Sequence, residues 1–131
     1  MARHGLRTSA TLVRGSFTEE GGREGVEALL RGRDRATGVF VGNDLAAVGA
    51  LDALDMHGLR VPEDVSVVGY DNIALAGLGH IDLTTIDQPR REMGETAVSL
   101  LLERRDGERG RARHLVEPPS LVVRGATGPP P

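Results

Sequence analysis

The amino-acid sequence predicts an α/β domain, with a mainly parallel, doubly wound sheet flanked by helices. Short apolar runs alternate along the 131 residues with longer segments whose apolar positions recur at helical spacing. Two of these runs, residues 38–42 and 64–71, lead into the same local pattern, Val-Gly-x-Asp, and lie one strand–helix unit apart. Repeated strand–helix–strand units favour a parallel sheet with right-handed crossovers.

The first expected elements are a short buried strand at residues 10–15 and a helix at residues 18–32. Thr18 and the two glutamates after it suit a helix start, and Gly32 suits the position just past a helix end. The apolar stripe of this helix consists of Val26, Leu29 and Leu30.

The middle of the chain predicts two further strands around an alanine-rich helix. Residues 38–42 are continuously apolar, as expected for a parallel strand covered on both faces. Residues 44–57 follow as a helix, residues 64–71 as the next strand, and residues 72–82 as a loop or short helix. The alanines allow the helix to lie close to a sheet or another helix, and its larger apolar residues are Leu45, Val48, Leu51 and Leu54.

The last part of the chain predicts a strand at residues 83–88 and a long helix at residues 90–105. Pro89 suits a first helical turn. Residues 113–125 offer one or two late strands broken by a pair of prolines, and residues 126–131 are expected to be a disordered tail. The apolar face of the long helix consists of Met93, Ala97, Leu100 and Leu101.

Composition limits the possible classes of function. The length fits one domain, and 39% apolar residues suffice for one core. The sequence has no long apolar run that could span a membrane and no secretory signal, and it lacks cysteine, which is compatible with the cytoplasm. A net charge of −3 argues against nucleic-acid binding by this chain alone, because phosphate binding needs a concentrated basic surface.

Polar residues directly after two predicted strands are the candidate ligand-binding residues. Because the carboxyl ends of parallel strands open onto one crevice, Asn43 and Asp71 are expected there together. Asp44 is interpreted mainly as a helix N-cap, and Asn43 as either a turn former or a ligand contact. No long helix follows Asp71 that it could cap, which favours a ligand-binding role for its carboxylate.

Other chemistries find little support in the sequence. His4, His57, His80 and His114 lie at no metal-like spacing, so no metal or cofactor is expected. The sequence contains no nucleophile elbow and no phosphate-binding loop. Asp44 and Asp71 could form a carboxylate pair, but no nucleophile accompanies them, and the chain is not expected to be an enzyme.

The motifs together resemble the effector-binding core of the LacI/GalR family of bacterial transcription regulators. These motifs are, in order, "LVRGSFTEEGG", "GNDLAAVGA", "GLRVPEDVSVVGYD", "LTTIDQP", "GETA" and "SLVVRGAT", and they cover nearly the whole chain. The resemblance implies a periplasmic-binding-protein-like type I fold, in which a small-molecule effector is held between two α/β subdomains.

The same resemblance implies three ligand-binding residues. Asp71 matches the acidic residue that hydrogen-bonds the effector, Phe17 matches an aromatic residue that stacks on it, and Asn43 matches a position that contacts sugar hydroxyls in some members. A ring stacked on Phe17 with its polar edge at Asp71 would suit a sugar, a nucleobase or a nucleoside. The alternative for Phe17 is a loop aromatic tucked into the core.

Compared with the family, this sequence is expected to be an incomplete effector-binding domain, mostly its C-terminal subdomain. It would comprise residues 1–82 of that subdomain, a crossing strand and helix of the other subdomain at residues 83–112, and closing strands at residues 113–125. The DNA-binding headpiece and the N-terminal subdomain have no counterpart here, so operator DNA would be bound only by the intact protein. No position matches the family's effector-contacting arginine, although Arg3 and Arg7 lie nearby in the sequence.

The resemblance also implies self-association. The long helix at residues 90–105 would normally bury its apolar face in the other subdomain, and here that face would meet water. The family dimerises through a surface that matches Val48, Asp52, Leu75 and Leu78, so a homodimer or larger assembly is expected. The alternative function is that of a periplasmic sugar-binding component of a transporter, which shares the fold.

Overall fold

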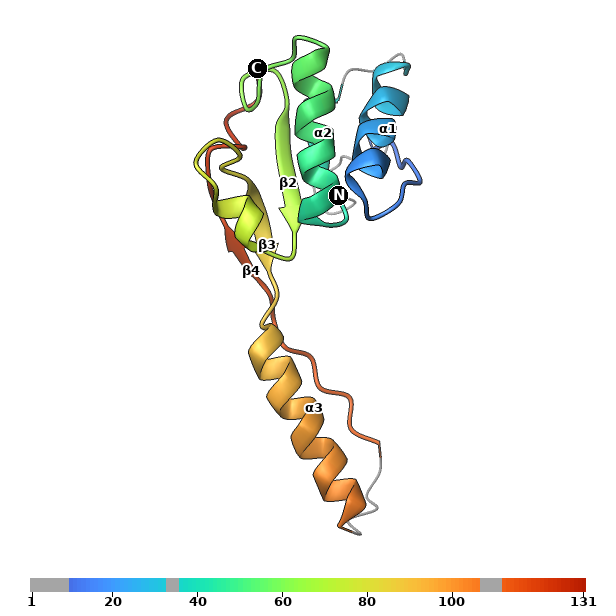
Figure 1. The fold of residues 1–131 in the computed structure, drawn as a ribbon, viewed down its shortest axis with the longest axis vertical. Helices are drawn as coiled ribbons and strands as arrows, with labels where there is room; N and C mark the ends of the chain where they lie inside the picture. The colour runs from blue at the N-terminus through green and yellow to red at the C-terminus, as the bar shows by residue number, and fades with distance from the viewer. Residues whose placement is uncertain (1–9, 33–35, 107–111) are drawn as a thin grey trace.

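A four-stranded sheet forms the centre of the protein. The structure, a computed structural model, describes residues 10–32, 36–106 and 112–131. The strand order is β1 (Gly38–Phe40), β2 (Ser66–Tyr70), β3 (Thr84–Asp87) and β4 (Ser120–Val122) (Figure 1). β1, β2 and β3 are parallel, and β4 is antiparallel to β3. The prediction of an α/β fold with a mainly parallel sheet is therefore confirmed.

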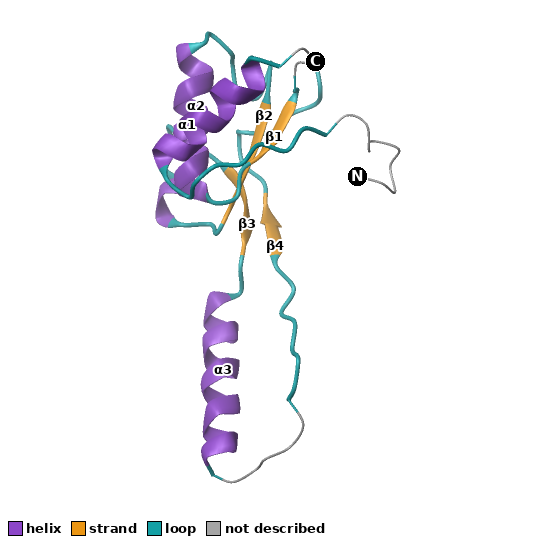
Figure 2. Cartoon of the chain, turned by 90° about the vertical axis from the view of Figure 1, so that its right-hand side faces the viewer, coloured by secondary structure: helices purple, strands orange, loops and turns teal. Residues whose placement is uncertain are grey.

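Two helices, α1 (Glu19–Leu30) and α2 (Asp44–Met56), lie side by side on one face of the sheet (Figure 2). α1 begins where the sequence predicts, because the side chain of Thr18 accepts a hydrogen bond from the backbone N–H of Gly21 at 3.1 Å. Glycines allow the two helices to approach closely. A Cβ atom on Gly22 would lie 1.8 Å from the carbonyl oxygen of Ala46, so only glycine fits there.

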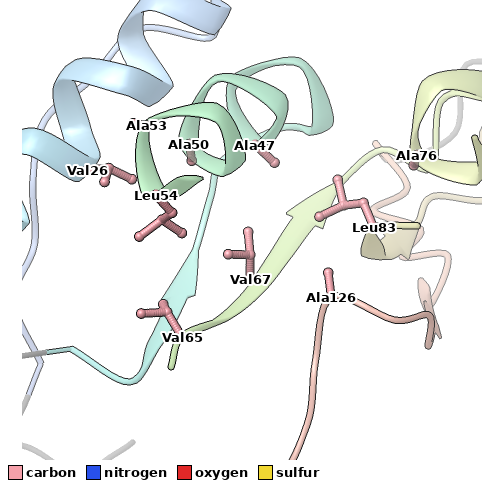
Figure 3. Close-up of a cluster of buried hydrophobic side chains, with 10 residues drawn as sticks. All are labelled: Val26, Ala47, Ala50, Ala53, Leu54, Val65, Val67, Ala76, Leu83 and Ala126. Carbon is pink, nitrogen blue, oxygen red and sulfur yellow. The ribbon is translucent and has the colours of Figure 1, made fainter. Parts of the chain in front are cut away.

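The hydrophobic core lies between α2 and the sheet. Alanines of α2 face β2, and the short 3₁₀-helix η3 (Ala74–Gly77) contributes Ala76 at one end of the core (Figure 3). The small residues reduce the distance from helix to strand, while a few larger side chains fill the remaining space. The core consists of Val26, Ala47, Ala50, Ala53, Leu54, Val65, Val67, Ala76, Leu83 and Ala126.

Helix α3 (Arg90–Arg105) projects away from the sheet and its two covering helices, and the chain returns beside it (Figures 1 and 2). Its bounds match the prediction. None of its residues is buried, and Leu101 is 67% exposed. The predicted exposure of its apolar face is therefore confirmed for Met93, Ala97 and Leu101, whereas Leu100 is half-buried. At its far end Glu103 forms an ion pair with Arg113 of the returning segment.

Two predicted segments differ from the structure. Residues 10–15 do not form a strand, and Leu12 is 94% exposed. The reason is that a strand needs a hydrogen-bonding neighbour, which these residues do not have among the described strands. The expected disordered tail is also wrong at its start. Ala126 is buried and accepts a backbone hydrogen bond from Val67 at 2.8 Å, and Gly128 donates one to the side chain of Ser66.

Within the described part of the chain, no helix has both the length and the apolar character needed to cross a membrane.

Candidate functional site

The carboxyl ends of the three parallel strands meet at one edge of the sheet, and the candidate ligand-binding residues lie in the loops there. Asn43 follows β1, Asp71 follows β2 and Gln88 follows β3. Ends of parallel strands are the usual position of ligands in open α/β sheets. The arrangement therefore presents amide and carboxylate groups from three loops at one edge.

Asn43 links this edge to the loop that carries Phe17. Its Oδ1 atom accepts a hydrogen bond from the N–H of Ala46 at 2.9 Å, so Asn43 is the N-cap of α2. Its Nδ2 atom donates to the carbonyl oxygen of Phe17 at 3.0 Å. The structure thus gives Asn43 the N-cap role that the sequence assigned to Asp44, and a ligand contact by its remaining amide hydrogen stays a prediction.

Phe17 is 70% exposed, so the alternative that it is tucked into the core is wrong. Its ring lies against Gly42, where an added Cβ would be 3.0 Å from Cε1 of the ring. The absence of a side chain at Gly42 thus leaves room for the ring. An exposed aromatic face held by a loop is suited to stacking on a planar or apolar ligand surface.

Asp71 lies in a backbone conformation that side chains rarely adopt. Its φ is 112°, and the next residue, Asn72, has a φ of 49°. Backbone strain of this kind persists only where the surroundings hold it, and it is concentrated at functional sites. The Asp71–Asn72 turn is therefore the part of this edge most indicative of ligand binding.

Neighbouring elements hold the turn by hydrogen bonds. The N–H of Asp71 donates to the carbonyl oxygen of Ile86 at 2.9 Å, and Nε2 of Gln88 donates to Oδ1 of Asp71 at 2.5 Å. Arg124 donates to Oδ1 of Asn72 at 2.8 Å, and Arg90 to its carbonyl oxygen at 3.3 Å. Among the described residues, Oδ2 of Asp71 has no hydrogen-bond partner, so the carboxylate retains accepting capacity.

Sequence reasoning assigned no role to Gln88 or Arg124. Gln88 belongs to the quoted motif "LTTIDQP" and Arg124 to "SLVVRGAT", so both were part of a recognised pattern. Their contacts with the turn could not be inferred, because they depend on how β3 and β4 align with the end of β2.

Asp44 is not the helix cap that the sequence suggested. It is fully buried and accepts hydrogen bonds from Oγ1 of Thr85 at 2.5 Å and from the N–H of Ile73 at 2.8 Å. Its carboxylate thereby joins the start of α2 to β3 and to the loop after β2. Because the carboxylate is fully buried, Asp44 stabilises the packing of these elements and is not accessible to a ligand at this edge.

An apolar cavity of about 350 Å³ lies beside this edge. It lies between residues 12–17, α1 and β1, and its lining includes Phe17 and Gly42. Asn43 and Asp71 are not part of the lining. The structure therefore brings Phe17 and Asn43 together through a hydrogen bond but does not enclose Phe17 and Asp71 in one cavity.

The residues expected at a dimer surface lie on α2 and around η3, two elements in contact. Val48 and Leu75 are half-buried, and Leu78 is exposed. Asp52 forms an ion pair with Arg23 of α1, and the hydrogen bond to Asp52 raises the pKa of the Arg23 guanidinium above its ordinary value. These residues are accessible to a partner, and their place in a dimer stays a prediction.

Within the described ranges, no three His, Asp or Glu side chains are grouped so that they could hold a metal ion.

Comparison with known proteins assigns the chain to a family. Residues 1–127 match the periplasmic binding protein-like domain. A crystal structure of a LacI transcriptional regulator from a Rhodococcus species superposes with a TM-score of 0.91 and 45% identity, over 98% of this chain and 47% of that one. The chain belongs to the LacI family of transcriptional regulators. This LacI-family chain contains the periplasmic-binding-protein-like fold that the motifs implied.

Two further relatives show how much of a regulator this LacI-family chain spans. It is 42% identical over 113 residues to the HTH-type transcriptional repressor PurR of Erwinia tasmaniensis. The aligned region covers 86% of this chain and 33% of that repressor. A LacI-family regulator from Enterococcus faecalis, solved with bound ribose, matches with a TM-score of 0.81 and 34% identity, over 91% of this chain and 44% of that one. The chain thus spans a third of the curated repressor and under half of the solved regulators.

Proposed function

We propose that this chain is the effector-sensing and dimerisation portion of a LacI-type transcriptional regulator. The effector would be a small polyhydroxylated molecule, such as a sugar, or a nucleobase-like or nucleoside-like molecule. Asp71 would accept hydrogen bonds from it, Asn43 would donate its remaining amide hydrogen, and Phe17 would stack on its ring. The observation that carries the proposal is the Asp71–Asn72 turn, held in a strained conformation with one carboxylate oxygen unpartnered among the described residues.

Regulation follows from the same site. In the intact protein, an effector bound at this edge would favour one orientation of the subdomains over another. That change would be transmitted to DNA-binding elements outside this chain, and the protein would act in the cytoplasm. The transporter alternative is less favoured, because the similar proteins are transcriptional regulators.

The effector site is tested by replacing Asp71 with asparagine. Asparagine tolerates positive φ, so the turn should be kept while the negative charge is lost. Hydrogen bonds to a charged group contribute about 1.5–3 kcal/mol, so the Kd should rise by roughly ten- to a hundredfold. The Kd for D-ribose and for adenosine would be measured by NMR titration of the isotope-labelled chain.

Asp55→Asn is the matched control for this test, because Asp55 is an exposed carboxylate near the far end of α2. It makes the same change in net charge away from the strand ends and should leave both Kd values unchanged. If the unaltered chain binds one of the two ligands and Asp71→Asn binds it with the same Kd, Asp71 is not an effector-binding residue.

Self-association is tested by native mass spectrometry across a concentration series. We expect a dimer through the surface formed by Val48, Asp52, Leu75 and Leu78. Leu78→Arg should raise the dimer dissociation constant by about tenfold or more, because it places a charge in a buried contact. Leu101→Arg alters an exposed leucine of α3 and should leave the dimer intact. A monomer at every concentration would contradict the dimer, and loss of the dimer only in Leu101→Arg would move its surface to α3.

A further inference from the structure

Asn72 is tied by hydrogen bonds to three other elements of the fold. Its N–H donates to Oγ1 of Thr85 at 3.4 Å, and its carbonyl oxygen accepts from the exposed Arg90 at 3.3 Å. Its side-chain Oδ1 accepts from Nη2 of Arg124 at 2.8 Å. The first two distances are long for hydrogen bonds, so the bond from the charged guanidinium of Arg124 is the strongest of the three.

Arg124 is itself held in place. Its Nη1 atom donates to the carbonyl oxygen of Leu83 at 2.7 Å, so two nitrogens of one guanidinium bind two acceptors. Its backbone N–H donates to Oγ1 of Thr84 at 2.9 Å, and that hydroxyl contacts its carbonyl oxygen at 3.0 Å. Thr84 is buried. A planar guanidinium fixed in this way presents Nη2 at a defined point, where it locates the side chain of Asn72.

The position of Asn72 determines the direction of the Asp71 side chain. The peptide group before Asp71 is fixed by the hydrogen bond from its N–H to the carbonyl oxygen of Ile86. The peptide group after Asp71 includes the N–H of Asn72, whose side chain is bonded to Arg124. A φ of 112° at Asp71 is rarely adopted by a residue with a side chain, so it persists only while both peptide groups are held. Release of Asn72 would therefore let Asp71 relax and redirect its carboxylate.

Gln88 reports on this conformation without any effector. Its Nε2 atom donates to Oδ1 of Asp71 at 2.5 Å. This hydrogen bond forms with Asp71 at its present φ, so a redirected carboxylate would break it. Gln88 is also the only glutamine in the sequence, so its side-chain amide can be observed by itself.

We propose that Asn72 and Arg124 are positioning residues for effector binding. Arg124 fixes Asn72, and Asn72 holds the carboxylate of Asp71 in its binding orientation, although neither residue contacts the effector. This role rests on the proposed binding of the effector by Asp71. It makes the affinity depend on the hydrogen bond between Asn72 and Arg124, because the apparent Kd rises as the fraction of binding-competent molecules falls.

The first test uses the chain without effector, labelled selectively on the side-chain nitrogen of glutamine. Exchange of the Gln88 amide protons with water is measured by NMR. Asn72→Gly replaces Asn72 with a residue that readily adopts positive φ, but it removes the acceptor for Arg124. We expect the hydrogen-bonded proton of Gln88 to exchange faster in this variant by about tenfold or more.

Three further variants separate positioning from other effects. Asn72→Asp retains an acceptor for Arg124 and tolerates positive φ, so the Gln88 amide should exchange as slowly as in the unaltered chain. Arg124→Lys presents one nitrogen in place of two and should act like Asn72→Gly, and the double variant should be no faster than the faster single variant. Arg60→Lys is the matched control, because Arg60 is paired with Asp64 before β2, and it should change nothing at Gln88.

The second test measures the Kd for D-ribose and for adenosine. If the held turn is populated in about a tenth of the Asn72→Gly molecules, the Kd of the ligand that binds should rise about tenfold. Arg60→Lys should leave that Kd unchanged. If neither ligand binds the unaltered chain, the effector assignment under the proposed function fails, while the Gln88 amide still decides whether Asn72 and Arg124 hold Asp71.

Three results would overturn the proposal. The first is equally slow exchange of the Gln88 amide in Asn72→Gly, and a lower urea midpoint in that variant would then show that the bond to Arg124 serves stability alone. The second is equally fast exchange in Asn72→Asp, since the acceptor would then be irrelevant. The third is an unchanged Kd in Asn72→Gly for a ligand that binds the unaltered chain.

Discussion

Replacing Asp44 with alanine is expected to destabilise the chain by about 3 kcal/mol or more, because each buried donor left without an acceptor costs about 1–3 kcal/mol. The carboxylate accepts from Thr85 and from the backbone of Ile73, and it is fully buried. Alanine would leave both donors unsatisfied and also open a cavity at the start of α2. Since a domain of this kind has a net stability of only about 5–15 kcal/mol, this one change removes a large part of it.

The measurement is urea unfolding followed by circular dichroism, with two graded variants beside alanine. Asp44→Asn should lose less stability, because its Oδ1 atom can accept from Ile73 while its amide donates to the hydroxyl of Thr85. Thr85→Val keeps the shape of the side chain but removes one donor, and it should lie between the unaltered chain and Asp44→Ala. An Asp44→Ala midpoint equal to that of the unaltered chain would show that these hydrogen bonds contribute nothing to stability.

Replacing Gly22 with alanine is expected to destabilise the chain although alanine is the better helix former. The added Cβ would lie 1.8 Å from the carbonyl oxygen of Ala46, so α1 and α2 would have to separate. Overpacking of this kind typically costs about 1–3 kcal/mol, which exceeds the gain of about 1 kcal/mol in helix propensity.

Gly25→Ala, in the same helix, isolates the cause. A Cβ at Gly25 would have no heavy atom within 4 Å, so only the helix propensity changes. This variant should therefore stabilise the chain by up to about 1 kcal/mol. Opposite signs for the two variants in thermal unfolding would establish close helix packing at Gly22. A destabilisation of the same size in both would attribute the effect to the loss of glycine and not to the packing of α1 on α2.

The candidate site was partly predictable from the sequence, for a local reason. A glycine and a polar residue directly after an apolar run indicate a turn at a strand end, which is how Asn43 and Asp71 were found. The exposure of Phe17 could not be decided in this way. The ring lies against Gly42, which is 25 residues further along the chain, and this contact is set by the fold.

The role of Asp44 was misjudged because its local pattern is the same as that of a cap. Its neighbours in the sequence indicate a helix start, and the structure places the cap one residue earlier, at Asn43. Asp44 does not act as the cap because its carboxylate accepts a hydrogen bond from the hydroxyl of Thr85. Thr85 lies 41 positions away in the sequence, and β3 brings it against α2. Gly69 completes this arrangement, since a side chain there would collide with the carboxylate of Asp44.

The sequence by itself determined the elements whose signals are local: the parallel strands, the start of α1 at Thr18, and the full extent of α3. Periodicity, capping and apolar runs act over a few residues, so they can be recognised without the fold. Only the tertiary structure decided which segments with strand-like sequence became strands. Residues 10–15 have a suitable composition but no strand to pair with in the described part of the chain, whereas Ala126 is ordered because β2 and Asp82 provide its backbone partners. Pairing between distant segments, and the burial that it requires, is a property of the folded chain and not of any stretch of its sequence.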